Sequence, residues 1–560
     1  MEYSKYQLDI FEEIKSGVGN LLIEACAGSG KTTTLINALN HINENKKILF
    51  CAFNTDIVKE LEKKIGKKDN IEITTIHGLG RKIVRLNLRK DIELNEYKYS
   101  NYLYNNLHIY AEKYHNVNKN NLNEVIKLVS LMRDNLADNE HDGLRIINKY
   151  GINCTHDELL MAVDTVRWGT ENTDVIDYTD MIYLPSALNM QPWKCQYDYI
   201  FVDEAQDLSA AQLSIVLKCQ KINTRFVFVG DPNQAIYGFS GSDAESFDNI
   251  KRMANMKLMP LSISYRCAKK IVTLAQTIVP SIQYNESSPT GEIVYDADLN
   301  DVVDGDMIIC RNNAPLMEIY YNLLREGKKC YIKGKDIGTN LINMINSTYI
   351  EVLNPDMKED GVFARLNEKL NNLVNNIMNT YNIDEESALN TITCTSFIDK
   401  INALKIISEN FTTASEVKAE IEKIFIDNEE DGISLSTVHK SKGLEANNVF
   451  IAFPSLMPSK SAKLDWEIKQ EKNLKYVAFT RAKLKLCFLK EDKDSIFLKK
   501  NNYFKFKPKT VHKIDSADDK PNNIQSFEKR TIKKLGGVNK QVQNKSMFSF
   551  KDKTIKLNKL

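Results

Sequence analysis

Short apolar runs and longer helical repeats alternate along this chain. Three runs, at residues 21–23, 199–202 and 225–229, are β-prone and lead into turns that contain glycine or acidic residues. Runs of this length and composition predict strands buried in a parallel sheet. Two more strand-like runs follow at 306–310 and 329–332. The pattern predicts an α/β fold.

The stretches between these runs show a helical repeat. Apolar residues recur every three or four positions at 122–136, 363–381 and 414–426, which is typical of helices with one buried face. Residues 82–185 and 336–430 contain few strand-like runs. We therefore expect a mainly helical insertion in each of two strand-rich parts.

The composition narrows the class of protein. A chain of 560 residues should form several domains, because single cores rarely exceed about 250–300 residues. Its 42% hydrophobic and 27% charged residues are typical of globular proteins, and the formal net charge is +1. A nucleic-acid surface would therefore have to be a local patch.

The ten cysteines form no C-x-x-C pair, which argues against a zinc ribbon or a clustered iron–sulfur site. Unclustered cysteines are simplest to explain in a reducing compartment. The first residues lack the apolar core of a secretion signal, and no apolar run reaches the ~18 residues of a membrane span. We expect a protein of the cytoplasm, in a bacterium or a phage-infected host cell, with no membrane partner.

Residues 25–32 read Ala-Cys-Ala-Gly-Ser-Gly-Lys-Thr, between a strand-like run and a predicted helix. Gly28 and Gly30 allow the backbone to wrap a β-phosphate, Lys31 can reach the β- and γ-oxygens, and the Thr32 hydroxyl can bind Mg²⁺. Ala25 stands where the usual motif has glycine. The predicted nucleotide-binding residues of this loop are Ala25, Cys26, Ala27, Gly28, Ser29, Gly30, Lys31, Thr32 and Thr33.

Two further motifs fit a nucleotide site. The run 199–202 ends in Asp203, which can hold Mg²⁺, and Glu204, which can orient and deprotonate the attacking water. Gln234 lies just after the run 225–229, where its neutral amide could sense a γ-phosphate.

With these three motifs in order, residues 1–490 resemble the UvrD/Rep family of superfamily 1A DNA helicases, and within it the F-box DNA helicase branch. The resemblance implies two RecA-like P-loop NTPase cores, each a parallel sheet flanked by helices. It also implies the use of ATP with Mg²⁺.

The resemblance gives roles to residues outside the loop. Gln7 would read adenine, Tyr265 would stack on it, and Glu445 would hold the ribose. Arg266 would reach the γ-phosphate, and Arg481, in Tyr-Val-Ala-Phe-Thr-Arg-Ala, would be the arginine finger. Arg481 lies about 450 residues after Lys31, so it must come from another domain, and ATP binding would close the two domains.

The same resemblance places DNA contacts on several other motifs. Base stacking contributes ~1–3 kcal/mol per base and works for any base, which suits aromatic side chains in a strand groove. Ordinary core packing of Phe53 and Tyr237 stays open as an alternative. The implied DNA-contacting residues are Phe53, Asn54, Thr75, His77, Tyr237, Phe239, Thr437 and His439.

The motifs also set the expected domain boundaries. A basic tail follows the motor, and it could contact single strands, dock a replication or recombination protein, or simply be solvated. The expected parts are 1–81 and 186–260 (first core), 82–185 (its insertion), 261–335 and 431–500 (second core), 336–430 (its short insertion) and 501–560 (tail).

Residues 234–239, Gln-Ala-Ile-Tyr-Gly-Phe, resemble the subgroup that moves 3′→5′. The leading hypothesis is an ATP-dependent 3′→5′ DNA helicase and translocase acting on single-stranded DNA and duplex–single-strand junctions. The alternative is a DNA-stimulated ATPase that strips proteins from DNA or loads a partner without strong unwinding. Ser240, where many relatives have arginine, and the short second insertion favour the alternative slightly.

Overall fold

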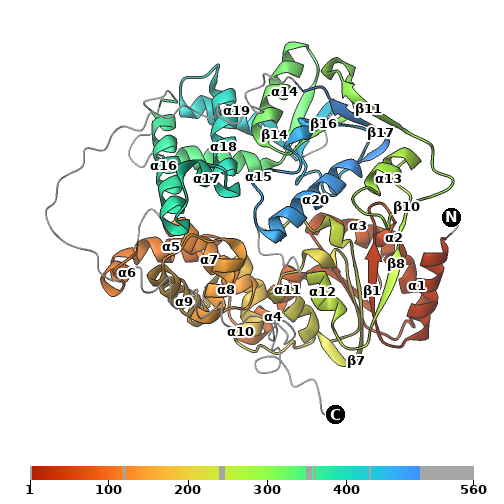
Figure 1. Ribbon diagram of the computed structural model, residues 1–560. Helices are drawn as coiled ribbons and strands as arrows, with labels where there is room; N and C mark the ends of the chain where they lie inside the picture. Colours follow the sequence, from red (N-terminus) through yellow and green to blue (C-terminus); the bar gives the residue numbers. More distant parts are fainter. Residues whose placement is uncertain are drawn as a thin grey trace, which may run out of the picture. The chain divides into compact units, whose positions relative to one another are not determined.

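The computed structural model describes residues 3–117, 121–238, 246–348, 356–357, 361–427 and 431–491 (Figure 1). Two parallel sheets, each covered by helices, organise this part of the chain. The fold is α/β, as the sequence predicts. The predicted basic tail, 501–560, lies outside the described residues. No described helix has both the length and the apolar character needed to cross a membrane.

The first sheet has six strands, all parallel to their neighbours. The strand that precedes the phosphate loop lies between two others, and the strand that carries the acidic pair lies two places away. In spatial order the strands are β3 (Ile71–Thr75), β2 (Ile48–Ala52), β6 (Tyr197–Val202), β7 (Gln220–Gly230), β1 (Asn20–Ala25) and β8 (Met256–Leu261).

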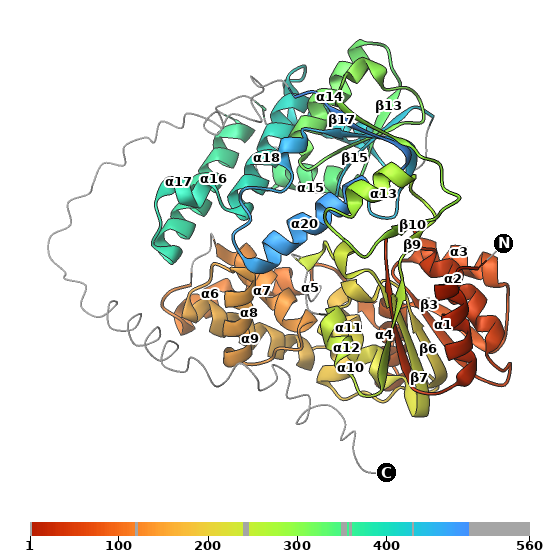
Figure 2. The ribbon, with the colours of Figure 1, turned by 45° about the vertical axis from the view of Figure 1, so that its right-hand side comes forward.

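Alternating side chains of β1 enter two separate hydrophobic cores. Leu21 and Ile23 pack into one core, and Leu22 packs into the other. Figure 2 shows the corresponding helices on opposite sides of the sheet. The helices on the Leu21 side are α1 (Lys5–Ser16), α2 (Lys31–Ala38) and α3 (Thr55–Ile65); those on the Leu22 side are α4 (Ile76–Leu88), α10 (Tyr178–Ala187), α11 (Ala210–Lys218) and α12 (Ser246–Lys251).

The second sheet has seven strands, again all parallel to their neighbours. Its flanking helices include α13 (Lys269–Ala275), α14 (Asn313–Arg325) and α20 (Asp465–Phe479). In spatial order the strands are β11 (Glu292–Ala297), β17 (Ala482–Leu489), β16 (Ala446–Ala452), β12 (Met307–Cys310), β15 (Ile433–Thr437), β13 (Cys330–Lys333) and β14 (Phe425–Ile426).

Helices fill the two stretches between strands of these sheets. The first stretch contains α5 (Lys98–Asn105), α6 (Leu107–Lys113), α7 (Leu122–Asp134), α8 (Glu140–Tyr150) and α9 (His156–Glu171), with the short pair β4 (Glu93–Leu94) and β5 (Val175–Ile176). The second contains α15 (Lys335–Asn346), α16 (Val362–Tyr381), α17 (Glu385–Leu389), α18 (Ile392–Ser408) and α19 (Ala414–Ile424).

One predicted helix is too long. The helical repeat at 414–426 predicts a single helix, but α19 ends at Ile424 and the next two residues form β14. Phe425 pairs with Ile332 of β13. Sheet pairing outweighs the local repeat here, because these residues complete the edge of the second sheet.

A shared hydrophobic cluster joins the two sheets' parts. Cys26 and Ala27 from the loop after β1, and Ile236 from the turn after β7, pack with buried residues of α20 such as Tyr476 and Val477. A second short sheet, β9 (Ile263–Ser264) with β10 (Gln283–Tyr284), lies in the chain between β8 and β11. The loop that follows β1 is therefore covered by side chains that come from far along the chain.

Candidate functional site

The loop between β1 and α2 has the backbone of a phosphate cradle. Gly30 precedes α2 with φ 79° and places no side-chain cap on the helix, so the first-turn amides remain available to an anion. Gly28 has φ 71°, and a Cβ there would lie 2.5 Å from Arg266 Cβ. The hydroxyl of buried Ser29 has no hydrogen-bond partner among the described residues. Only glycine fits at position 28, and an anion would satisfy the free donors.

The acidic pair at the end of β6 meets this loop. Lys31 Nζ donates to Glu204 Oε1 at 2.6 Å, and Thr32 Oγ1 donates to Asp203 Oδ2 at 3.0 Å. The Glu204 amide donates to Asp203 Oδ1 at 2.8 Å. Glu204 has φ 52°, a strained conformation for a residue other than glycine, and such strain clusters at functional sites. Four predicted site residues therefore lie together.

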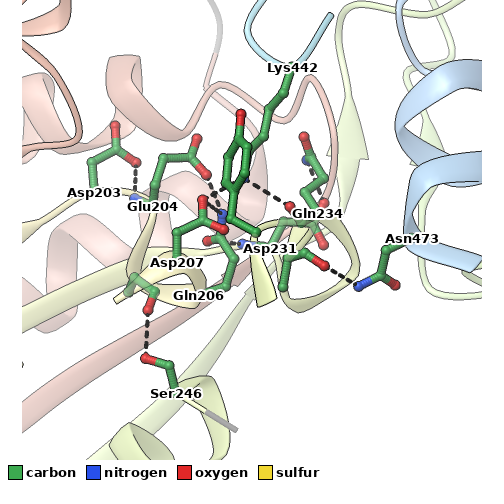
Figure 3. A network of polar contacts seen from close by, with 12 residues as sticks. Asp203, Glu204, Gln206, Asp207, Asp231, Gln234, Ser246, Lys442 and Asn473 are labelled. Carbon is green, nitrogen blue, oxygen red and sulfur yellow. Dashed lines mark hydrogen bonds and ion pairs between the residues drawn. The ribbon is translucent and has the colours of Figure 1, made fainter. Parts of the chain in front are cut away.

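A chain of hydrogen bonds leads from Glu204 to Gln234 (Figure 3). The side-chain amide of Gln206 donates to the carboxylates of both Glu204 and Asp207. Its Oε1 accepts from the Asp231 amide at 3.0 Å. Asp231 Oδ2 in turn accepts from Gln234 Nε2 at 2.6 Å. The side chain of Gln234 is therefore held in one orientation.

Two cationic side chains from the second sheet's part reach the same network. Lys442 Nζ donates to the Asp207 carboxylate and, at 2.9 Å, to the Gln234 carbonyl (Figure 3). Arg481 is almost fully buried, and its Nη2 lies 3.4 Å from Gln234 Oε1. Lys31 lies beside the first sheet and Arg481 beside the second. One network thus connects them.

Two side chains of helix α20 make further hydrogen bonds across this junction. Asn473 Nδ2 donates to the carbonyls of Pro232 at 3.2 Å and Ala235 at 2.9 Å. The Tyr476 hydroxyl accepts from the Ala27 amide in the phosphate loop at 2.9 Å. A movement of α20 would therefore displace both the phosphate loop and the turn after β7.

The residues expected to hold the adenine and the ribose contact the phosphate loop or its neighbours. Tyr265 donates its amide to the Gly28 carbonyl at 2.9 Å and leaves 41% of its surface exposed. Glu445 forms ion pairs with Arg266 at 2.6 Å and Lys483 at 2.7 Å. Gln7, in α1, donates its side-chain amide to Thr34 Oγ1 of α2 at 3.0 Å. Gln7 therefore contacts the helix that starts at the loop.

Burial and neighbouring charges set the ionisation of the site. Burial opposes the charge of Lys31, but Glu204 and Asp203 outweigh it and raise its pKa. Burial likewise opposes the charge of Glu204, yet Lys31 and Lys442 hold its pKa well below the usual range. Burial and the Glu204 charge raise the pKa of Asp203. Glu204 is therefore ionised at neutral pH.

Two further groups in the network have shifted pKa values. Burial raises the pKa of Asp207 to about 6, against the attraction of Lys442. Burial, with a smaller contribution from nearby Arg266, lowers the pKa of Arg481 to about 9. Arg481 remains cationic at neutral pH, which a group that stabilises phosphoryl charge requires.

Two of the residues expected to contact DNA stack on each other. The rings of Phe53 and Tyr237 lie 6.0 Å apart with an interplanar angle of 15°, and Phe53 is 47% exposed. The Tyr237 hydroxyl donates to the His439 carbonyl at 3.4 Å. Burial lowers the pKa of His439 to about 3 and also lowers the pKa of His77. Both imidazoles are therefore neutral at pH 7.

The remaining expected DNA contacts have structural roles as well. Asn54 Oδ1 accepts from the Ile57 amide at 2.9 Å and caps α3, while Thr75 Oγ1 accepts from the Gly78 amide at 3.0 Å and caps α4. Thr437 is buried, and its hydroxyl accepts from the Lys440 amide. Phe239 and Ser240 lie outside the described residues.

Sequence reasoning gave no role to several members of the network: Gln206, Asp207, Asp231, Lys442, Asn473 and Tyr476. Asp231 could have been found, because it follows β7 as Asp203 follows β6, and carboxyl ends of parallel strands share one edge of the sheet. The partner of Lys442 lies 235 residues away in the chain, so no local pattern could have identified it.

Comparisons with known proteins match both halves of the chain. Residues 9–255 match the UvrD/REP helicase N-terminal domain, and residues 335–493 match the UvrD-like helicase C-terminal domain.

Individual relatives are distant. The ATP-dependent DNA helicase Rep of Buchnera aphidicola subsp. Baizongia pistaciae is 22% identical over 282 residues, covering 47% of this chain and 41% of that protein. The F-box DNA helicase protein 1 of Schizosaccharomyces pombe is 25% identical over 509 residues, covering 83% and 55%. The ATP-dependent DNA helicase PcrA of Bacillus subtilis is 22% identical over 628 residues, covering 88% and 83%. The chain thus spans less than half the length of the Buchnera Rep proteins it matches.

Proposed function

This chain belongs to the family of UvrD-like helicases, and from that premise we propose that it is an ATP-dependent 3′→5′ DNA helicase and translocase. The observation that carries the proposal is the junction between the two sheets. Lys31 and Glu204 from the first meet, through Gln234, the buried Arg481 of the second. Hydrolysis at such a site depends on the relative position of two bodies, which is how a motor couples chemistry to movement.

In this proposal the γ-phosphoryl lies among Lys31, Gln234, Arg266 and Arg481. Lys31 forms an ion pair with Glu204. The β- and γ-oxygens of ATP compete for the same amine, so ATP binding would release Glu204. The depressed pKa of Glu204 keeps it ionised, and an ionised carboxylate can orient and deprotonate the attacking water.

Thr32 and Asp203 are the proposed Mg²⁺ ligands. The hydroxyl and the carboxylate already lie in hydrogen-bond contact, and both supply the oxygen atoms that Mg²⁺ prefers. The ion would neutralise phosphate charge during transfer. Asp203 also accepts the Glu204 amide, which fixes the direction of its carboxylate.

The base and sugar of ATP would lie near Tyr265, Gln7 and Glu445. Tyr265 offers an exposed ring for stacking on adenine. Gln7 would read the adenine edge, and Glu445 would hold the ribose. Because Glu445 pairs with Arg266, binding of the sugar and of the γ-phosphate would rearrange one ion pair.

The proposed single-strand track follows the stacked pair Phe53 and Tyr237 and the turns capped by Asn54 and Thr75. His77 and His439, both neutral, suit stacking or hydrogen bonding with bases. Thr437 would act through the turn that it caps. Phe239, which lies outside the described residues, is also a proposed DNA contact.

We also propose that the protein works in the cytoplasm, because its ten cysteines are free thiols. The expected parts 82–185 and 336–430 serve in this proposal as the two insertions of the cores. Docking of a replication or recombination protein on residues 501–560 is part of the same proposal.

Strand separation on tailed duplexes tests the polarity. ATP-driven unwinding of a duplex with a 3′ single-stranded tail, and none with a 5′ tail, is the expected result. Unwinding from the 5′ tail alone would contradict it. The second candidate function, a remodelling ATPase, is favoured by the short insertion of the second core. It would give DNA-stimulated hydrolysis and displacement of a bound protein without strand separation on either tail.

A further inference from the structure

Helix α4 presents one face to the protein and the opposite face to solvent. Ile76, Leu79, Ile83 and Val84 are buried. Gly80 is pressed against α10, where a Cβ would lie 2.1 Å from the carbonyl oxygen of Met181. The inward face of α4 is therefore fixed by packing. Its outward face carries Arg81 and Arg85, one helical turn apart, and Arg89 follows four residues later as the C-cap residue; all three are exposed. We call these three the α4 arginine row.

The α4 arginine row has no protein partner within the described residues, and this is unusual for the chain. Only fourteen of its 75 basic residues are arginines. The other ten described arginines each have a hydrogen bond or ion pair: Arg133, Arg145, Arg167, Arg225, Arg252, Arg266, Arg311, Arg325, Arg365 and Arg481.

Lysines next to the row do have acidic partners. Lys82 pairs with Glu72 at 2.6 Å, and Lys90 pairs with Asp174 at 2.6 Å. Glu72 and Asp174 are thus already paired with lysines. Like charges one turn apart destabilise a helix, so three unpaired arginines on one face are best explained by an external anion.

The position of the row suggests which anion. Thr75 caps the start of helix α4 and His77 lies in its first turn, and the proposed function places a DNA contact there. From Arg81 to Arg89 the row extends about 12 Å at 1.5 Å per residue. One strand of duplex DNA carries a phosphate every 3.4 Å or so along its axis, so this length matches about three or four phosphates. Arginine also binds phosphate oxygens in a bidentate manner.

We propose that the α4 arginine row binds the phosphate backbone of DNA and extends the contact surface from the Thr75 turn along α4. This inference rests on the proposed DNA-binding function. The phosphates could belong to the single strand or to the duplex of a junction, because both carry the same chemistry.

The test is the salt dependence of DNA binding. Arg81→Gln, Arg85→Gln and Arg89→Asn are combined, with asparagine at 89 because that residue has φ 52° and asparagine tolerates this conformation. Fluorescence anisotropy follows binding of a labelled single strand and of a 3′-tailed duplex across a salt series. The expected result is weaker binding, with the log–log salt slope reduced in size by ~2 on the single strand or ~3 on duplex phosphates.

Two controls separate charge loss at the row from other effects. Arg81→Lys, Arg85→Lys and Arg89→Lys combined should keep the wild-type slope, because counterion release depends on charge. Lys46→Gln, Lys329→Gln and Lys423→Gln remove three exposed charges elsewhere and should also leave the slope unchanged. ATP hydrolysis without DNA should be at the wild-type rate in every variant, since the row does not contact the nucleotide site.

Comparing the two DNA substrates shows which phosphates the row binds. A reduced slope on the single strand places that strand on the row, and a reduced slope on the tailed duplex alone places the duplex there. Unchanged slopes on both substrates, with normal binding by the wild type, would overturn this inference and leave the proposed function standing. A wild type that binds neither substrate would refute both.

Discussion

At the scale of single residues, a tight constraint in the nucleotide site is the contact between Gly28 and Arg266. It joins the phosphate loop to the residue that is proposed to reach the γ-phosphate, with only 2.5 Å between Arg266 Cβ and the place of a Cβ at 28. Backbone and side chain approach so closely that the loop must move if position 28 gains any side chain.

Gly28→Ala should therefore weaken nucleotide binding strongly. Gly66→Ala is the matched control, because Gly66 has nearly the same φ, 73° against 71°, but nothing within 4 Å of the added Cβ. Both variants carry the backbone strain, and only the first carries the clash. Titration with a fluorescent ATP analogue measures the difference, and equal affinities in the two variants would refute the role of the contact.

The raised pKa of Asp207 makes the stability of the protein depend on pH. Its folded-state pKa of about 6 lies above the value of about 4 expected in an unfolded chain. For an acid with a raised pKa, the folded state binds the extra proton, so stability falls as pH rises from about 4 to about 6. Asp207→Asn removes this titration. The melting temperature of the variant relative to wild type should be more favourable at pH 7 than at pH 5.

Asp304→Asn serves as the control for that comparison, because Asp304 is exposed. Its melting temperature relative to wild type should change little between the two pH values. A relative melting temperature of Asp207→Asn that falls from pH 5 to pH 7 would contradict the raised pKa.

At the scale of elements, local sequence identified the strands that carry chemistry better than those at the edges. The runs that became β1, β6 and β7 are continuous apolar stretches followed by glycine or acidic residues. Edge strand β8 was missed, since it contains Lys257 and Pro260. Proline is tolerated at a sheet edge because one side of the strand needs no ladder partner. β8 pairs with β1, which is far away in the sequence, so no local pattern predicts this pairing.

The same limit applies to the site. Lys31, Thr32, Asp203 and Glu204 are predictable because each follows a strand or starts a helix in a recognisable local pattern. Lys442 and Asn473 are not, because they act across a junction whose geometry depends on how two sheets pack. Composition and periodicity contain no information on that packing.

Helix α4 gives an element-scale prediction. Thr75 Oγ1 caps its first turn, so Thr75→Ala should cost about 1 kcal/mol of unfolding free energy. Thr75→Ser keeps the hydroxyl and should restore most of it. Denaturant unfolding measures both, and an alanine variant as stable as wild type would show that the cap contributes nothing.

At the scale of the whole molecule, the part of the chain that forms the second sheet contacts the nucleotide site, which lies at the first sheet, through a few side chains. Lys442 is the most connected of these, with its side chain only 9% exposed and Asp207 at 1%. A buried ion pair across a moving junction is costly to break on one side only. This makes it a sensitive reporter of coupling.

Lys442→Gln should lower the kcat of DNA-stimulated ATP hydrolysis by about tenfold to a hundredfold, the equivalent of one charged hydrogen bond. Lys440→Gln is the control, because Lys440 lies on the same turn but pairs with Asp336. Steady-state ATPase assays with single-stranded DNA compare the two. Equal kcat values would show that the Lys442 contact does not couple the two parts.

ATPase rates with and without single-stranded DNA, in wild type and Glu204→Gln, test DNA-stimulated ATP hydrolysis with Glu204 as the base. We expect strong stimulation of the wild type by DNA. In the variant we expect a fall in kcat of about 10²–10⁴, with ATP binding retained. An unstimulated wild type, or a variant that hydrolyses ATP at the wild-type rate, would contradict it.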